Sequence, residues 1–239
     1  MTAIIQAPLS IAALLLASAL PLAAQDAATA ETPAADAPAA AAPAEAAPAT
    51  APAAPMAPPG DDRVKPSAGS YTFDPQHSQI VFDYNHMGFS TSHGFVNGVE
   101  GKITLDPANP GGSTVEASFP LSSLHTIDAE LDKHIMGPDF FNVTGDPPVV
   151  TFKSTSVEVD DDDDEARITG DLTLNGVTKP VVLEVEFEGA GLDPMTQVET
   201  VGFSAEAKIR RSDFNLGAFA PAVEDEVEIE INVEAKKDG

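Results

Sequence analysis

The most constraining feature of this chain is a strict alternation of apolar and polar residues near its carboxyl end. The stretch EVEIEINVE, residues 226–234, places Val227, Ile229, Ile231 and Val233 on one face and mainly glutamates on the other. Successive side chains of a strand point to opposite faces, so this segment predicts a strand with one wet side. Such a strand must belong to a sheet that buries a single face.

The same alternation recurs in earlier segments. The apolar sets are Val181, Leu183, Val185 and Phe187; Val201, Phe203, Ala205, Ala207 and Ile209; Val99, Ile103 and Leu105 with Phe95; and Ile168, Leu172 and Leu174. Asn175-Gly176 predicts a tight hairpin turn, and shorter candidate strands lie at 80–86, 113–119 and 149–159. The pattern predicts about eight antiparallel strands, which bury one side by closing into an up-and-down barrel or by stacking as two sheets.

One segment, SLHTIDAELDKHIMGPDFF at 123–141, breaks this rhythm. Ile127, Leu131 and Ile135 recur at helical spacing, and Gly137-Pro138 ends the pattern. We expect one short helix that plugs or flanks the barrel.

The amino-terminal part of the chain has a different composition. Residues 1–24 carry no charge and contain the apolar run LSIAALLLASALPLAA, which predicts a signal peptide ending at Ala24; an uncleaved anchor is the less favoured alternative. Residues 25–66 are almost entirely Ala and Pro with scattered acids, a composition that predicts a disordered linker, acting either as a spacer or as a tail without a function. Residues 67–239 are then a single barrel domain.

Acidic residues dominate the charge of the chain. Its formal net charge of −26 repels nucleic acid, which we exclude as a partner. The run DDDDDE at 160–165 predicts a solvated hairpin tip, with a calcium loop disfavoured because the glycine-interrupted ligand pattern is missing.

Three of the five histidines fall within HSQIVFDYNHMGFSTSHG, residues 77–94. His77 and His86 are an odd number of residues apart and point to opposite faces of one strand, while His93 lies beyond Gly88 and a polar segment. This spacing does not assemble a zinc triad.

Covalent chemistry is equally unsupported by the sequence. The chain has no cysteine and no Gly-x-Ser-x-Gly motif. Asp128, Asp132 and His134 could perform acid–base chemistry, although carboxylates on a short exposed helix are more often caps and solubilising charges. We expect no catalytic residue and no metal, and keep a histidine- or carboxylate-dependent metal-binding or hydrolytic enzyme as the alternative.

Polar groups on the predicted apolar faces are the best site candidates. Tyr84 and His86 share a face with Phe82, and Arg211 continues the register of Ile209 at a strand end. One interpretation is structural, with a satisfied core histidine and an arginine paired to Asp213 or Glu206. The other is an apolar tube with polar groups at one end, which suits an amphiphile.

Five segments in order resemble the YceI-like, polyisoprenoid-binding family: YTFDPQHSQIVFDYNHMG, SSLHTIDAELDKHIMGPDFFNV, PPVVTFKSTSVE, ITGDLTLNGVTKPVVLEVEFEG and RRSDFNLG. Together they span about 71–235. The resemblance implies a lipocalin-like, eight-stranded antiparallel barrel whose long apolar pocket holds isoprenoid chains or other long-chain amphiphiles, generally in the periplasm.

The resemblance also supplies motif positions without a catalytic role. They are His77, Ser78, His86, Asp132, His134, Phe140, Phe141, Phe152, Arg211 and Phe214. The chain departs from the family at Tyr71, where Trp is usual, at His125, where Asp is common, and at Ile127 and Asn215, where Gly is common and usually supplies a positive φ.

These observations combine into one expectation: an exported, periplasmic lipid-binding protein and not an enzyme. The expected partner is a lipid, an isoprenoid or a quinone; we expect no resident cofactor and no stable membrane insertion after cleavage, and a homodimer is left open. The predicted ligand-binding residues are Phe82, Tyr84, His86, Phe95, Phe140, Phe141, Phe152, Phe203, Arg211 and Phe214.

Overall fold

The computed structural model describes residues 65–160 and 164–239. The predicted signal peptide, the linker up to residue 64 and the centre of the acidic run lie outside these described residues. None of the helices in the described part is both long and apolar enough to cross a membrane.

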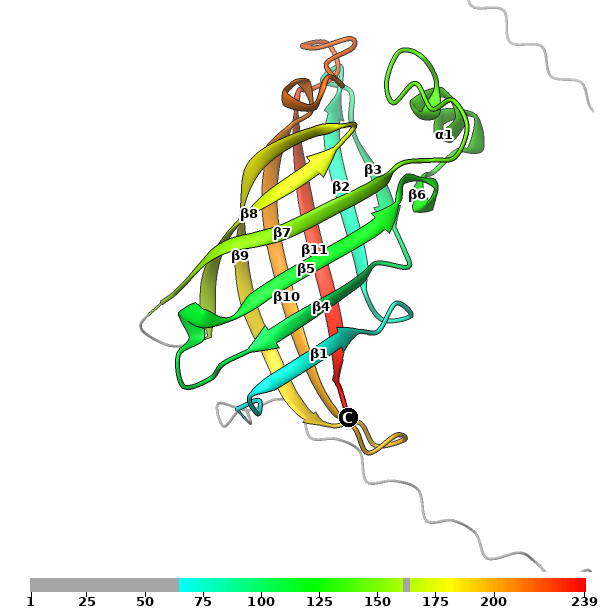
Figure 1. Cartoon of the computed structure of the whole chain (residues 1–239). Coiled ribbons are helices and arrows are strands. Elements are labelled where there is room, and N and C mark those ends of the chain that lie inside the picture. Colours follow the sequence, from blue (N-terminus) through cyan, green and yellow to red (C-terminus); the bar gives the residue numbers. More distant parts are fainter. Residues whose placement is uncertain (1–64, 161–163) are drawn as a thin grey trace, which may run out of the picture. The chain divides into compact units, whose positions relative to one another are not determined.

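Strands make up most of the described chain (Figure 1). They are β1 (Gly69–Phe73), β2 (Gln79–His86), β3 (Ser90–Val96), β4 (Glu100–Leu105), β5 (Thr114–Pro120), β6 (Leu124–Thr126), β7 (Val149–Val159), β8 (Glu165–Leu174), β9 (Val177–Leu192), β10 (Glu199–Arg210) and β11 (Glu226–Lys237). The helical elements are α1 (Ala129–Met136) and the short 3-10 turns η1 (Pro110–Gly112), η2 (Leu121–Ser123) and η3 (Arg211–Phe214).

Six of the shorter strands are the halves of three bent strands. β1 pairs with β4 while β2 pairs with β3, and β4 pairs with β5 while β3 pairs with β6. The last strand, β11, pairs with both β1 and β2 and so closes the ring. Counted in this way, the described strands form an eight-stranded antiparallel up-and-down barrel, which confirms the predicted fold class.

A buried carboxylate secures the bend between β1 and β2. Asp74 accepts hydrogen bonds from Lys236 Nζ at 2.6 Å and from the His77 ring at 2.9 Å, and its backbone N–H donates to the Glu234 carbonyl at 2.8 Å. The Lys236 and His77 hydrogen bonds hold the pKa of Asp74 well below its usual range. His77 therefore has a structural partner in the turn that joins the two halves of the first strand.

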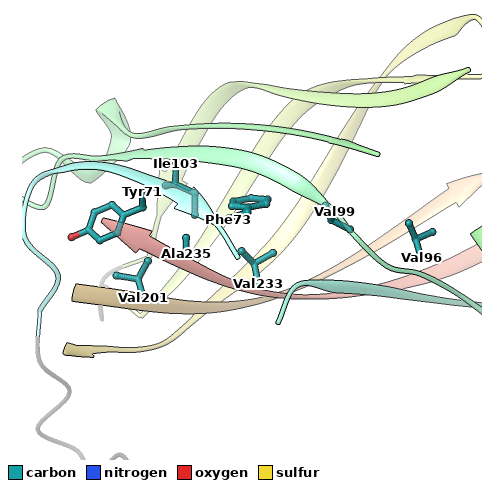
Figure 2. Close-up of a cluster of buried hydrophobic side chains, with 8 residues drawn as sticks. All are labelled: Tyr71, Phe73, Val96, Val99, Ile103, Val201, Val233 and Ala235. Atoms are coloured by element: carbon teal, nitrogen blue, oxygen red, sulfur yellow. The ribbon is translucent and has the colours of Figure 1, made fainter. Parts of the chain in front are cut away.

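At the end of the barrel that carries β1, buried hydrophobic side chains pack against one another. Figure 2 shows the cluster, which we call the floor. Its members are Tyr71, Phe73, Val96, Val99, Ile103, Val201, Val233 and Ala235. Tyr71 is fully buried, and its hydroxyl lies 2.8 Å from both the Ser67 carbonyl and a Glu199 carboxylate oxygen, which share its single proton. Burial, together with Glu199, raises the pKa of Tyr71 to about 12.

Two sequence-based expectations need correction here. Phe95 does not share a face with Val99 and Ile103: it is 45 % exposed, because Gly98, with a φ of 63°, lies in the bend and reverses the register. The polar segment before His93, which the sequence suggested as a break between His86 and His93, begins β3, and His93 pairs with Asp83 of β2 within the same hairpin.

The predicted helix exists but begins later than its pattern suggested. Asp128 is its N-cap and accepts hydrogen bonds from the backbone N–H groups of Glu130 and Leu131. Ile127 precedes the cap and is 90 % exposed, so it is not part of the apolar face. Asn215 adopts the positive φ expected of a glycine position, at 60°, whereas Ile127 does not.

Candidate ligand cavity

The barrel encloses a cavity of about 950 Å³ between the floor and α1. Every long strand contributes alternate apolar side chains to it, as the period-two pattern requires. The wall includes Phe82, Phe119, Phe152, Ile168, Leu172, Val181, Leu183, Val185, Phe187, Phe203, Ile209, Val227, Ile229 and Ile231. Such a tube provides apolar surface along its length and few hydrogen-bond partners.

Polar side chains such as Asp106, Thr114 and Glu165 border the cavity beside η1 and the start of β8, and a second polar group lies near α1 and the 211–225 segment. Tyr84, His86, His134 and Arg211 all border the cavity there. The His134 ring packs edge-on against Phe140 at 5.4 Å and faces Phe219 at 6.4 Å, centroid to centroid. We call this polar and aromatic end the mouth.

Arg211 is buried, and its guanidinium fastens the loop that follows it. Nε donates to the Glu224 carbonyl at 2.7 Å, Nη1 to the carbonyls of Leu216 and Ala218 at 2.5 and 2.8 Å, and Nη2 to the Val223 carbonyl at 2.7 Å. Burial lowers the pKa of this group. The expected pairing with Asp213 or Glu206 is wrong, because four backbone carbonyls take the place of a carboxylate.

Tyr84 differs from Arg211 in its hydrogen bonding. Its side chain borders the cavity close enough to Arg211 to influence that group electrostatically. Within the described part of the chain the Tyr84 hydroxyl has no hydrogen-bond partner, and its oxygen keeps accessible surface. This hydroxyl can therefore donate to or accept from the polar end of a bound molecule.

Eight of the ten predicted ligand-binding residues border the cavity. They are Phe82, Tyr84, His86, Phe140, Phe141, Phe152, Phe203 and Arg211. Phe95 lies on the outer surface, where its ring packs against His125 at 5.4 Å, and Phe214 is 1 % exposed in a separate cluster with Val181 and Ala207. Contact of any of these residues with a ligand remains a prediction.

Sequence reasoning missed Phe219 and Met87, which also border the mouth. Both lie in loops, have positive φ and follow no strand or helix period, so no periodic signal identifies them. Phe219 is brought to the mouth by the loop that Arg211 holds.

The histidines are distributed over different parts of the barrel. His77 is in the β1–β2 turn, His86 is at the mouth, His93 is on the outer face of β3, and the His125 ring lies 3.6 Å from Asp132. Among residues 65–160 and 164–239, no group of three or more His, Cys, Asp or Glu side chains could hold a metal ion.

Comparisons with known proteins agree with this architecture. A curated relative, protein YceI of Escherichia coli O17:K52:H18, is 42 % identical over 169 residues, which cover 70 % of this chain and 86 % of that protein. A UPF0312 protein of Pectobacterium carotovorum is 41 % identical over 169 residues, which again cover 70 % of this chain and 86 % of that protein. Among solved structures, the YCEI protein of Campylobacter jejuni is 28 % identical with a TM-score of 0.57 and covers 65 % of this chain and 90 % of its own.

BcnA of Burkholderia cenocepacia, at 22 % identity, shares the fold with a TM-score of 0.59 over 68 % of this chain and 98 % of its own. The model of the YceI-like domain matches residues 71–235, from the buried tyrosine of the floor to the last buried residue of β11. All of the residues that line the cavity, except Lys65 and Pro66, lie within that match, and the chain belongs to the YceI-like domain family.

Proposed function

We propose that this protein binds a polyisoprenoid or another long-chain amphiphile, with the chain inside the barrel and the polar end at the mouth. The observation that carries the proposal is the predominantly apolar cavity of about 950 Å³ that extends between the floor and the mouth. Ligand pockets of this size are usually apolar with a few convergent polar groups, which is the arrangement of this tube and its mouth.

Area burial supplies the affinity in this proposal. Burying a chain of about twenty carbons gains on the order of 10 kcal/mol gross, at ~0.8 kcal/mol per methylene, before ordering costs are subtracted. The Tyr84 hydroxyl and the His86 and His134 rings are available to orient the polar end. The proposal needs no catalytic residue.

We further propose export to the periplasm, because residues 1–24 have the length and composition of a signal peptide. Transport, storage and protection of the envelope are the roles that such a lipid carrier would serve. The 25–66 segment would then separate the barrel from the site of export or simply trail from it.

Native mass spectrometry of protein purified from its own cell envelope tests the proposal. We expect a co-purifying lipid whose mass survives gentle desolvation and disappears after organic extraction. An empty barrel across several independent preparations, with no uptake of added polyprenol, would overturn the proposal.

A further inference from the structure

Two neighbouring segments at the mouth carry no charged residue. Residues 84–92 run from the end of β2 into β3, and residues 215–223 follow η3. Neither segment contains Asp, Glu, Lys or Arg, although the chain has 38 acidic residues and a formal net charge of −26. Charge keeps the surface of such a protein soluble, so two uncharged segments side by side need a reason. We call the turn 86–90 and the loop 217–223 the two tips.

Backbone hydrogen bonds join the two tips into one piece. The Met87 N–H donates to the Ala222 carbonyl at 3.0 Å, and His86 forms an antiparallel bridge with Val223. The Val223 carbonyl in turn accepts a hydrogen bond from Arg211 at 2.7 Å. The side chains of the tips are therefore held in fixed positions beside the mouth.

The tips expose large apolar side chains to solvent. Phe89 is 87 % exposed, Phe219 is 54 % exposed and Met87 is 49 % exposed. Among the large apolar side chains that are exposed in residues 65–160 and 164–239, only Met87 and Phe219 also border the cavity. The apolar surface of the tube therefore continues past the mouth onto the outside of the protein.

Met87 and Phe219 also have a costly backbone conformation. Their φ angles are 58° and 63°, and bulky side chains are disfavoured in this left-handed region. In the β2–β3 turn, asparagine is the favoured residue before Gly88. The other non-glycine residues of the described part with positive φ are all amides: Asn142, Asn175, Gln197 and Asn215. Strain of this kind gathers at functional sites, which indicates that the two apolar side chains are kept for a function.

We propose that the two tips dock the mouth on the surface of a neutral phospholipid bilayer, with Phe89, Met87 and Phe219 in the interfacial layer. Binding of this kind scales with the apolar area that is buried, and three side chains give a reversible contact without stable insertion. Because the barrel is acidic, anionic lipids repel it, so the contact depends on apolar burial and favours zwitterionic headgroups.

A bilayer suits this surface better than a protein partner does. The exposed side chains lie beside the mouth, and a protein seated on them would cover the opening. A bilayer at the same place lets a lipid tail pass between the membrane and the cavity without crossing water, which avoids exposing its methylenes. In this respect the inference rests on the proposed function.

The chain contains no tryptophan, so a single one can serve as a local reporter. Phe89→Trp places the reporter on a tip. Met195→Trp is the matched control, because Met195 is 92 % exposed in the β9–β10 loop at the opposite end of the barrel (Figure 1). Both proteins are mixed with phosphatidylcholine vesicles, with and without brominated acyl chains. We expect a blue shift and quenching by the brominated lipid for Phe89→Trp, and neither change for Met195→Trp.

A second substitution in the Phe89→Trp protein measures the contribution of the turn. Met87→Asn removes an apolar side chain and supplies the favoured turn residue, so the affinity for the vesicles should fall about three- to tenfold while the urea midpoint stays constant or rises. Binding of Phe89→Trp should persist in about 0.5 M NaCl, because salt screens charges and does not weaken apolar burial. Vesicles that contain phosphatidylglycerol should bind it more weakly.

The same emission change from both reporters, or no change from either, would overturn the inference. Binding that disappears in high salt or that requires phosphatidylglycerol would overturn it too, as would a concentration-dependent dimer in size-exclusion chromatography that Phe89→Ser abolishes. The proposed function fails separately. A barrel that carries no lipid in mass spectrometry but docks through Phe89 contradicts the proposed function alone, whereas a lipid-loaded barrel that does not dock contradicts this inference alone.

Discussion

Replacing Arg211 by alanine should destabilise the mouth of the barrel far more than it changes the preference among head groups. The guanidinium donates four hydrogen bonds to backbone carbonyls, and the side chain is only 8 % exposed. At about 1 kcal/mol net for each hydrogen bond, its loss should cost about 4 kcal/mol, and unsatisfied buried carbonyls add to that cost where water cannot enter. Whole domains are stable by only about 5–15 kcal/mol, so this is a large fraction.

The measurement is urea unfolding of wild type, Arg211→Ala and Arg211→Lys. Lysine keeps the charge but cannot reproduce the planar fork that reaches four carbonyls, so it should recover less than half of the loss. Affinities for a phosphorylated isoprenoid and for an uncharged quinone should fall together, because the loop that carries Phe219 is released in both cases. A destabilisation below about 1 kcal/mol, or a selective loss of the phosphorylated ligand, would refute the argument and return Arg211 to direct head-group binding.

Three further predictions concern single side chains. Tyr84→Phe should weaken an alcohol or quinone ligand by about three- to tenfold and leave unfolding unchanged, as calorimetry and urea titration can show; equal affinity would remove Tyr84 from the site. Hydrogen bonds from Ser67 lower the pKa of Glu199 to about 2 from an ordinary 4.5. The ionised Glu199 therefore stabilises the folded state above pH 4.5, and this stabilisation is lost as the pH falls toward 2. The urea midpoint of unfolding should drop over that range, and it should drop less in Glu199→Gln. Phe203→Ala should weaken ligand binding because Phe203 borders the cavity, whereas Phe95→Ala, on the outer surface, should not; matched losses in the two variants would contradict the placement of the wall.

The strand pattern by itself predicts much of the architecture. Alternation in 226–234, 201–209 and 181–187 reports which face each strand buries, because side-chain direction along a strand has a period of two. The same rule identified Phe82, Tyr84 and His86 as neighbours on an inward face, and all three border the cavity.

The rule failed where a strand bends. Period-two alternation places Phe95 on the same face as Val99, but the Gly98 bend lies between them, and a change of register at one residue turns the side chain to the other face. Ile127 kept helical spacing with Leu131 but precedes the Asp128 cap, and spacing alone does not locate a helix start.

The sequence by itself thus determined a one-sided antiparallel sheet, its approximate strand count and its resemblance to the YceI-like family, because those depend on local periodicity and on short motifs. Only the tertiary structure decided which polar groups already have hydrogen-bond partners and which side chains pack against one another. Arg211 is bound to carbonyls that follow it in the chain, and Phe82 fits over Gly94, because barrel closure brings loops and strands together in three dimensions. Periodicity describes the direction of a side chain, whereas its partner depends on what the closed barrel places beside it.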